Sequence, residues 1–240
     1  MRFVLRVLKA LALLVALIIA AGTGWLFAWP PELLRVGDGY AAKIVCSNVF
    51  IASRDADDVL HDDVQAPGNP LLRLVRVGVE RDSGRVTARF MGLFASSYAL
   101  YRGALGCTSV PDGNFEAAIN AVPFDPPAKM QANDAVWPQG EGTGNQPDAK
   151  IAAVLADARF AGPAMRAIVV VRGGRIVAEA YGPGFSSKTP LIGWSMTKTV
   201  NAAIFGRLML DGKVSFDDDH LMAQWKDDQR ARIKVSDLLG

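Results

Sequence analysis

The chain has 240 residues, of which 50% are hydrophobic and 21% are charged, so it can bury a core and is neither disordered nor collagen-like. It contains 26 Lys and Arg against 24 Asp and Glu, but Arg2, Arg6 and Lys9 lie in a leader without acidic residues. Without these three the chain has no surplus of positive charge for neutralising phosphates, so we expect no nucleic-acid partner.

The leader is predicted to be a transmembrane helix. Residues 10–29 contain no charged side chain, and twenty helical residues span about 30 Å, the thickness of the hydrocarbon core of a bilayer. Basic residues precede this run, Trp25 and Trp29 lie near its far end, and Pro30 stops the helix. The positive-inside bias then predicts an uncleaved signal-anchor over residues 1–29, single-pass in an inner membrane, with the body in the periplasm.

A cleaved signal peptide is the alternative. Ala20, Ala21 and Gly22 offer a cleavage site with small residues, and cleavage would leave a periplasmic or secreted protein. The apolar run is longer than the usual hydrophobic region of a signal peptide, which favours the anchor.

The two cysteines, Cys46 and Cys107, both lie in the part predicted to be exported. In an oxidising compartment they are expected to form one disulfide, worth ~4 kcal/mol in the chain-entropy model, although two buried free thiols remain an alternative. Neither cysteine has a second ligand at metal-site spacing, and the chain has only two histidines, His61 and His220. We therefore predict neither a metal nor a cofactor.

Residues 30–120 are predicted to form a small α+β extension in which no catalytic motif is found. Alternating and β-branched residues on both sides of an Asp-Ser-Gly turn indicate a hairpin. The expected elements are a short polar helix at 56–64, strands at 73–80 and 85–90, and a strand over 94–108 that bends at 103–106.

Residues 121–149 are rich in proline and glycine and are predicted to be a linker. Gly140, Gly142 and Gly144 do not indicate a phosphate-binding loop, because no strand precedes them and no Lys-Ser/Thr pair follows.

A further domain is predicted to begin at residue 150. Residues 151–160 have apolar side chains at helical spacing, and two β-rich runs, 167–171 and 176–181, flank a glycine turn as in a hairpin. The first run is apolar on both faces, as expected for a strand inside a sheet that helices cover.

Ser195 and Lys198 are the predicted catalytic residues. They stand three residues apart at the start of a helix that Asp211 and Gly212 should end, so their side chains emerge on the same side. A serine hydroxyl needs a base to take its proton, and a lysine is such a base only when burial or neighbouring charge lowers its pKa. Ser-x-x-Lys alone is a weak signal, because a capping serine beside a solvated lysine has the same spacing.

The surrounding sequence resembles the N-terminal part of the serine β-lactamase-like hydrolases. This superfamily includes class C β-lactamases, penicillin-binding DD-peptidases, related esterases and 6-aminohexanoate-dimer hydrolases. The matching features occur in family order: the hairpin at 167–181, Ser195-Met196-Thr197-Lys198, the turn at 210–218, and the helix start at 233–239.

The resemblance implies an α/β (α+β) fold with a β-lactamase/transpeptidase-like sheet and helices on its faces. It implies that Ser195 is acylated, that Lys198 is its general base, and that the backbone N–H of Ser195 forms half of an oxyanion hole. The substrate would be a small amide, ester or β-lactam. The family's Tyr-x-Asn and Lys-Thr-Gly motifs are missing, so residues 150–240 resemble a C-terminally truncated domain, and we expect these 240 residues alone to be inactive and marginally stable.

Three alternatives remain. A Ser-His-Asp triad is disfavoured because Ser195 lacks the second glycine of a nucleophile elbow and His220 follows three acidic residues. A membrane-anchored sensor or penicillin-binding protein would be acylated at Ser195 and not released. An inactive fragment would neither be acylated at Ser195 nor hydrolyse a substrate. The extension before the hydrolase segment resembles that of some 6-aminohexanoate-dimer-hydrolase-like members, which weakly favours an amide hydrolase.

Overall fold

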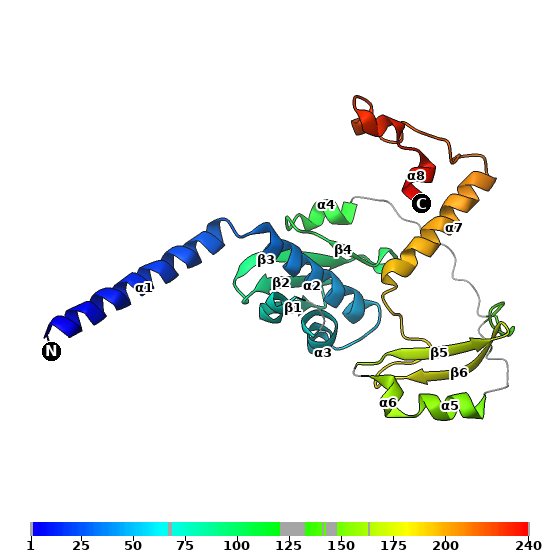
Figure 1. Ribbon diagram of the computed structural model, residues 1–240, viewed down its shortest axis with the longest axis horizontal. Coiled ribbons are helices and arrows are strands. Elements are labelled where there is room, and N and C mark those ends of the chain that lie inside the picture. Colours follow the sequence, from blue (N-terminus) through cyan, green and yellow to red (C-terminus); the bar gives the residue numbers. More distant parts are fainter. Residues whose placement is uncertain are drawn as a thin grey trace. The chain divides into compact units, whose positions relative to one another are not determined.

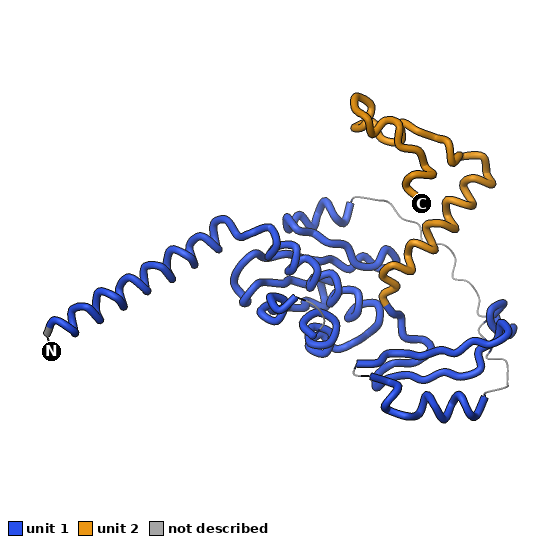
Figure 2. The backbone as a smooth tube through the Cα atoms, viewed as in Figure 1, with its two compact units in different colours: residues 1–191 blue, residues 192–240 orange. Residues whose placement is uncertain are grey.

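The computed structural model describes residues 2–66, 69–120, 133–140, 142, 148–162 and 164–239, and these form a mixed α+β protein, as predicted. The chain divides into two compact units, residues 1–191 and 192–240 (Figure 2). Most of the predicted linker at 121–149, including Gly144, lies outside the described residues. The proposed domain limits therefore remain predictions.

The leader forms one long helix, α1 (Arg2–Ala28), which ends just before Pro30. Its segment Phe3–Ala28 is long and apolar enough to cross a membrane, and none of its most apolar stretch is buried against the protein. A signal sequence has the same properties. The predicted apolar helix is thus present, and its role as a permanent anchor remains a prediction.

The first unit is built around helix α2 (Glu32–Phe50), which packs on a four-stranded antiparallel sheet (Figure 1). Small and β-branched residues at four-residue intervals, among them Ala41, Val45 and Val49, are buried on the face of α2 that meets the strands. The strands follow in sequence order: β1 (Val75–Glu80), β2 (Arg85–Phe90), β3 (Phe94–Tyr101) and β4 (Cys107–Ser109).

Short helices connect these elements; α3 and η1 cover the helix predicted at 56–64, whereas η2 occupies the first two residues of the strand predicted at 73–80. Asp55 caps α3 by accepting hydrogen bonds from the N–H groups of Asp57 and Asp58, and the helix continues as a π-helix. The predicted bend at 103–106 is a 3-10 turn between β3 and β4. These elements are α3 (Ala56–Val59), η1 (Leu60–Gln65), η2 (Pro70–Leu74), η3 (Gly103–Leu105) and α4 (Phe115–Asn120).

The predicted disulfide between Cys46 and Cys107 is present, and it joins α2 to the edge strand β4 with the two Cα atoms 6.1 Å apart. Beside it, the Nζ of Lys43 on α2 donates a hydrogen bond to the carbonyl of Cys107. Helix and sheet edge are therefore connected both covalently and by a hydrogen bond.

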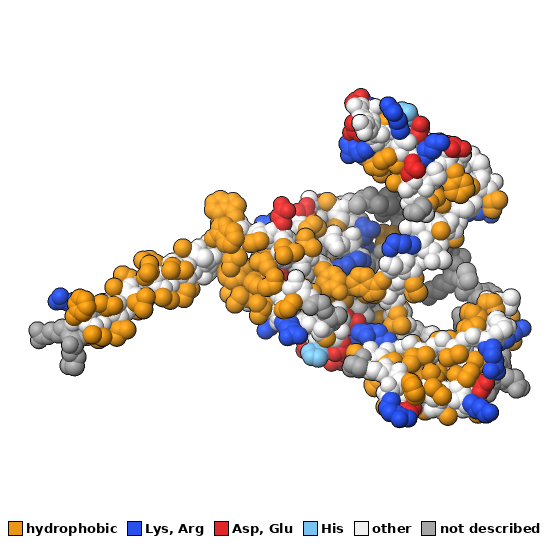
Figure 3. Space-filling model, viewed as in Figure 1, with side chains coloured by type: hydrophobic (Ala, Val, Ile, Leu, Met, Phe, Trp, Pro, Cys, Tyr) orange, Lys and Arg blue, Asp and Glu red, His pale blue; other side chains and the backbone are white. Residues whose placement is uncertain are grey.

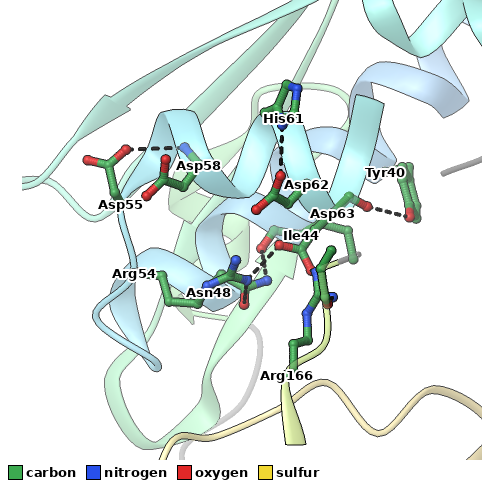
Figure 4. A network of polar contacts seen from close by, with 11 residues as sticks. Tyr40, Ile44, Asn48, Arg54, Asp55, Asp58, His61, Asp62, Asp63 and Arg166 are labelled. Atoms are coloured by element: carbon green, nitrogen blue, oxygen red, sulfur yellow. Dashed lines mark hydrogen bonds and ion pairs between the residues drawn. The ribbon is translucent and has the colours of Figure 1, made fainter. Parts of the chain in front are cut away.

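Asp63 on η1 binds two arginines: Arg54, which is close to it in the sequence, and Arg166, which comes from the segment just before β5 (Figure 4). Its carboxylate accepts from Arg54 Nη1 at 2.6 Å and from Arg166 Nη2 at 2.5 Å. Arg54 also donates to the side chain of the buried Asn48, and both guanidinium groups lie near the ring of Phe185. This cluster ties the α2 body to the segment just before β5.

The predicted second hairpin is present as β5 (Ala167–Arg172) and β6 (Arg175–Tyr181). Asp157 caps a new turn, so the helix expected at 151–160 is divided into α5 (Ala149–Leu155) and α6 (Ala158–Ala161). The expectation that the first strand is covered on both faces is wrong. Val169 and Val171 on β5 are 48% and 47% exposed. Strands β5 and β6 form a two-stranded sheet, and helix α5 packs on this sheet through contacts with β6.

The second unit contains one long helix, α7 (Thr197–Leu210), followed by an irregular segment. Backbone hydrogen bonds from His220 to Ala231 and from Val235 to Asp218 fold this segment back on itself. Its short helices are η4 (Trp194–Met196), η5 (Ala223–Trp225), η6 (Gln229–Arg232) and α8 (Val235–Leu239).

Candidate active site

Ser195 lies in the middle of η4, the single 3-10 turn that leads into α7. The N–H of Met196 donates to the carbonyl of Gly193 at 2.9 Å and closes this turn. Trp194 has a φ of +46°, in the left-handed region that favours glycine. Non-glycine residues with such backbone conformations cluster at functional sites, so the residue next to Ser195 has the kind of local geometry found there.

Lys198, in the first turn of α7, donates a hydrogen bond from Nζ to Ser195 Oγ at 3.0 Å. The spacing of three residues along the helix start brings the amine and the hydroxyl to the same side, as the sequence predicts. The structure therefore brings the two candidate residues within the distance at which a proton can pass between them. Their catalytic roles remain predictions.

The surroundings of the pair are open. Ser195 and Lys198 are both exposed, and so are the apolar side chains of Met196 in η4 and of Val200 and Ile204 on α7. The apolar face that begins at Met196 is thus uncovered in the described part of the chain. A lysine that acts as a base toward serine needs a drier environment than this one.

The far end of the helix is as predicted. Arg207 and Asp211 form an ion pair four residues apart at 3.1 Å, and the chain then leaves the helix through Gly212 at a φ of +66°. A residue with a Cβ is strained in this conformation, which explains why glycine stops the helix here.

The two histidines pair with acidic residues next to them in the sequence. His61, in the first unit, is exposed, and its Nδ1 lies 2.7 Å from Asp62. His220 is also exposed and pairs with the neighbouring Asp219 at 2.6 Å. Within the described residues, no group of three or more His, Cys, Asp or Glu side chains could hold a metal ion.

Sequence reasoning missed one buried ionisable group, Asp38 on α2. Its Oδ2 accepts a hydrogen bond from the N–H of Phe90 at 2.9 Å, next to a register shift between Ala88 and Phe90 where β2 leaves regular pairing with β3. Its Oδ1 is buried without a hydrogen-bond partner in the described part of the chain. Burial raises the pKa of Asp38 to about 7, against the lowering effect of the Phe90 N–H.

Comparison with known proteins finds no match: no protein family, no curated protein and no solved structure is detectably similar to this chain.

Proposed function

We propose that this protein is a membrane-anchored serine hydrolase of the β-lactamase-like superfamily that cleaves an amide or ester through an acyl-serine intermediate. The observation that carries the proposal is the 3.0 Å hydrogen bond from Lys198 Nζ to Ser195 Oγ at the start of a helix. Further support comes from the order of elements around it, with an antiparallel hairpin before the pair and a glycine-terminated helix after it.

In the proposed reaction, neutral Lys198 accepts the hydroxyl proton of Ser195 while Oγ attacks the carbonyl carbon of the substrate. The carbonyl electron pair moves onto oxygen and then returns, which breaks the bond to the leaving amine or alcohol, and Lys198 returns the proton to that group. Water then releases the acyl group from Ser195 as a carboxylic acid. The exposed amine of Lys198 must lose its surrounding water before it can act as the base. A substrate lying over Ser195 would displace part of that water.

The membrane part of the proposal rests on α1, whose apolar stretch is uncovered by protein and which has Arg2, Arg6 and Lys9 before this stretch and Arg35 as the first basic residue after it. By the positive-inside bias, the residues after α1 lie outside the cytoplasm, and the predicted compartment is the periplasm. The disulfide between Cys46 and Cys107 fits an oxidising compartment.

Acylation of Ser195 is the step to test, because it precedes any turnover. The full-length protein in its native membrane is treated with a fluorophosphonate probe or a β-lactam, and the adduct is located by mass spectrometry. We expect labelling at Ser195, none in Ser195→Ala, and labelling slowed by about 10²–10⁴-fold in Lys198→Met, the usual range for removing a general base. Ser186→Ala and Lys213→Met alter exposed residues of the same types and should label at the parent rate.

The fate of the adduct then separates the candidate activities. Recovery of free Ser195 with release of a carboxylic acid identifies a hydrolase, whereas an adduct that persists identifies an acylated sensor. No adduct at Ser195 with any probe, in protein whose disulfide is intact, would refute the proposal and favour the inactive fragment.

A further inference from the structure

The two ends of the four-stranded sheet differ in chemistry. The turn from β1 to β2, residues 81–84, is made of Arg, Asp, Ser and Gly. The turn from β2 to β3 at the opposite end is Met91-Gly92-Leu93, whose two side chains are 55% and 61% exposed. Hairpin turns in contact with water usually consist of small and polar residues, so the apolar turn marks this end as unusual. We call residues 29–36, 69–76 and 89–94 the apolar end.

Helix α1 meets the sheet at the apolar end. The ring of Phe27, in its last turn, lies edge-on to Phe94 at the start of β3, with the ring centroids 4.8 Å apart. Leu26 and Leu34 pack against the same small cluster of Phe90, Phe94 and Ala95. Hydrophobic surface therefore continues from the membrane-length helix onto the adjoining body (Figure 3). The exposed apolar side chains there are Trp29, Leu33, Val36, Leu71, Leu74, Met91 and Leu93.

The apolar end also carries two arginines, Arg76 and Arg89, that have no acidic partner among the residues that the structure describes. Arg76 on β1 and Arg89 on β2 are directly opposite in the register, an arrangement of like charges that is destabilising by itself. The hydrogen bonds of Arg76 go to backbone carbonyls, and Arg89 donates to the hydroxyl of Ser96 at 3.1 Å. At the other end of the same strand pair, Glu80 stands opposite Arg85. An anion between the two arginines would relieve their repulsion.

The overall charge of the apolar end has the same sign. Its sequence contains four arginines, at positions 35, 73, 76 and 89, and one acidic residue, Glu32. All four arginines are exposed. Such a surface suits anionic lipid headgroups, whose phosphates arginine binds with two parallel hydrogen bonds.

A hollow of about 290 Å³ opens on the same end between the first turns of α2 and the 3-10 helix η2. Its walls are almost entirely apolar and include Leu33, Val36, Leu71, Leu72 and Phe90. An apolar hollow in contact with water is costly, whereas the end of an acyl chain fills it favourably.

We propose that the apolar end lies in the surface of the same membrane that α1 enters. Its exposed apolar side chains, among them Leu71, Met91 and Leu93, insert between the headgroups and the upper acyl chains. Arg76 and Arg89 bind lipid phosphates. The body is then held flat on the bilayer and does not swing on its helix. This inference rests on α1 lying in a membrane and is independent of the chemistry at Ser195.

Fluorescence quenching from within the bilayer tests the placement. The full chain carrying Leu93→Cys is labelled with bimane; Cys46 and Cys107 are disulfide-bonded and buried, so the new thiol alone reacts. The protein is reconstituted in vesicles of equimolar phosphatidylcholine and phosphatidylglycerol that contain a lipid with a nitroxide on its acyl chain. Ser83→Cys, in the polar turn at the other end of the sheet, is the matched control.

We expect quenching at position 93 to exceed quenching at position 83 several-fold. Equal and weak quenching at both positions would overturn the proposal and leave a protein partner or a second copy as the occupant of the surface. Met91→Cys repeats the measurement should Leu93→Cys lose its disulfide. In Arg76→Gln/Arg89→Gln, quenching at position 93 should fall more in the anionic vesicles than in pure phosphatidylcholine, whose phosphate is neutralised by its own choline; an equal fall in both would remove the preference for anionic headgroups from the proposal. In all of these variants, acylation of Ser195 by the fluorophosphonate or β-lactam probe should proceed at the parent rate.

Discussion

Asp38 is the most unusual single residue of the first unit, because its carboxyl group has no exposed surface and lies in a helix packed mainly through small apolar side chains. Its carboxylate accepts a hydrogen bond from the backbone N–H of Phe90. A buried carboxyl group with so little support favours its neutral form, which is why its pKa rises to about 7.

This pKa predicts how stability depends on pH. Between about pH 4 and pH 7 the folded protein keeps a proton on Asp38 that the unfolded chain has released, so the free energy of unfolding should fall as the pH rises through this window. A shift of this size corresponds to on the order of 3–4 kcal/mol. Urea unfolding in detergent at pH 4.5 and pH 7.5 measures it. Asp38→Asn should flatten the dependence, whereas the exposed Asp82→Asn should not; an unchanged slope in Asp38→Asn would contradict the assignment.

At the same scale, the sequence predicts the contact between Ser195 and Lys198 but not its surroundings. A spacing of three residues at a helix start is a local property, and it fixes which side chains meet. Exposure is set by which distant segments cover a helix, and the spacing of the apolar residues Met196, Val200 and Ile204, all of them exposed, does not say whether such segments are present. Asp38 was missed for the same reason, since its burial depends on the sheet that packs over α2.

Among the elements, the contact between η1 and the segment before β5 depends on Asp63. Its carboxylate is mostly buried between Arg54 and Arg166, whose side chains are 11% and 29% exposed. Removing a negative charge from such a site leaves two positive charges facing each other with little water to screen them.

We therefore expect Asp63→Asn to reduce the free energy of unfolding by about 1–3 kcal/mol. Asp62→Asn is the matched control, because the neighbouring Asp62 pairs with the exposed His61 and should contribute less than about 1 kcal/mol. Denaturant unfolding measures both variants. Hydrogen exchange adds a test of mechanism: Arg166→Gln should speed exchange in β5 and β6 more than in β1 to β3, and equal effects would argue against a local tie.

The elements themselves were predictable in proportion to the local signal. The hairpins β1–β2 and β5–β6 follow from alternating residues on both sides of glycine turns. Helix α2 was missed although Ala41, Val45 and Val49 repeat every four residues, because Gly37, Gly39 and its β-branched residues are poor helix formers. Packing on the sheet outweighs that weak propensity. The division of the helix at 151–160 follows from Asp157, a capping residue inside an apolar pattern.

Across the whole molecule, buried residues are distributed unevenly between the two units. The main core lies in the first unit, between α2 and the sheet, and is closed by the disulfide. In the second unit, Ala231 and Val235 are the buried hydrophobic residues of the described part, and no residue of α7 is buried. Local stability follows the burial of apolar contacts, so the two units should open independently.

Native-state hydrogen exchange tests this difference. We expect the amides in the middle of α2 to be protected at least about tenfold more than those in the middle of α7, because α7 opens without disrupting the main core. The two helices have comparable lengths, so each serves as the reference for the other. Equal protection would mean that α7 is covered in solution by something that binds its apolar side chains.

The bond between Cys46 and Cys107 also determines where this protein can mature. A polypeptide translated in a reducing cytosol keeps both thiols, and its central helix and edge strand are then joined without a covalent link. In the proposed topology, the link forms after translocation delivers the chain to an oxidising environment, where it closes a loop of about sixty residues. The proposal thus predicts an order of events: insertion of the leader comes first, oxidation second, and the covalently closed body lies on the far side of the membrane.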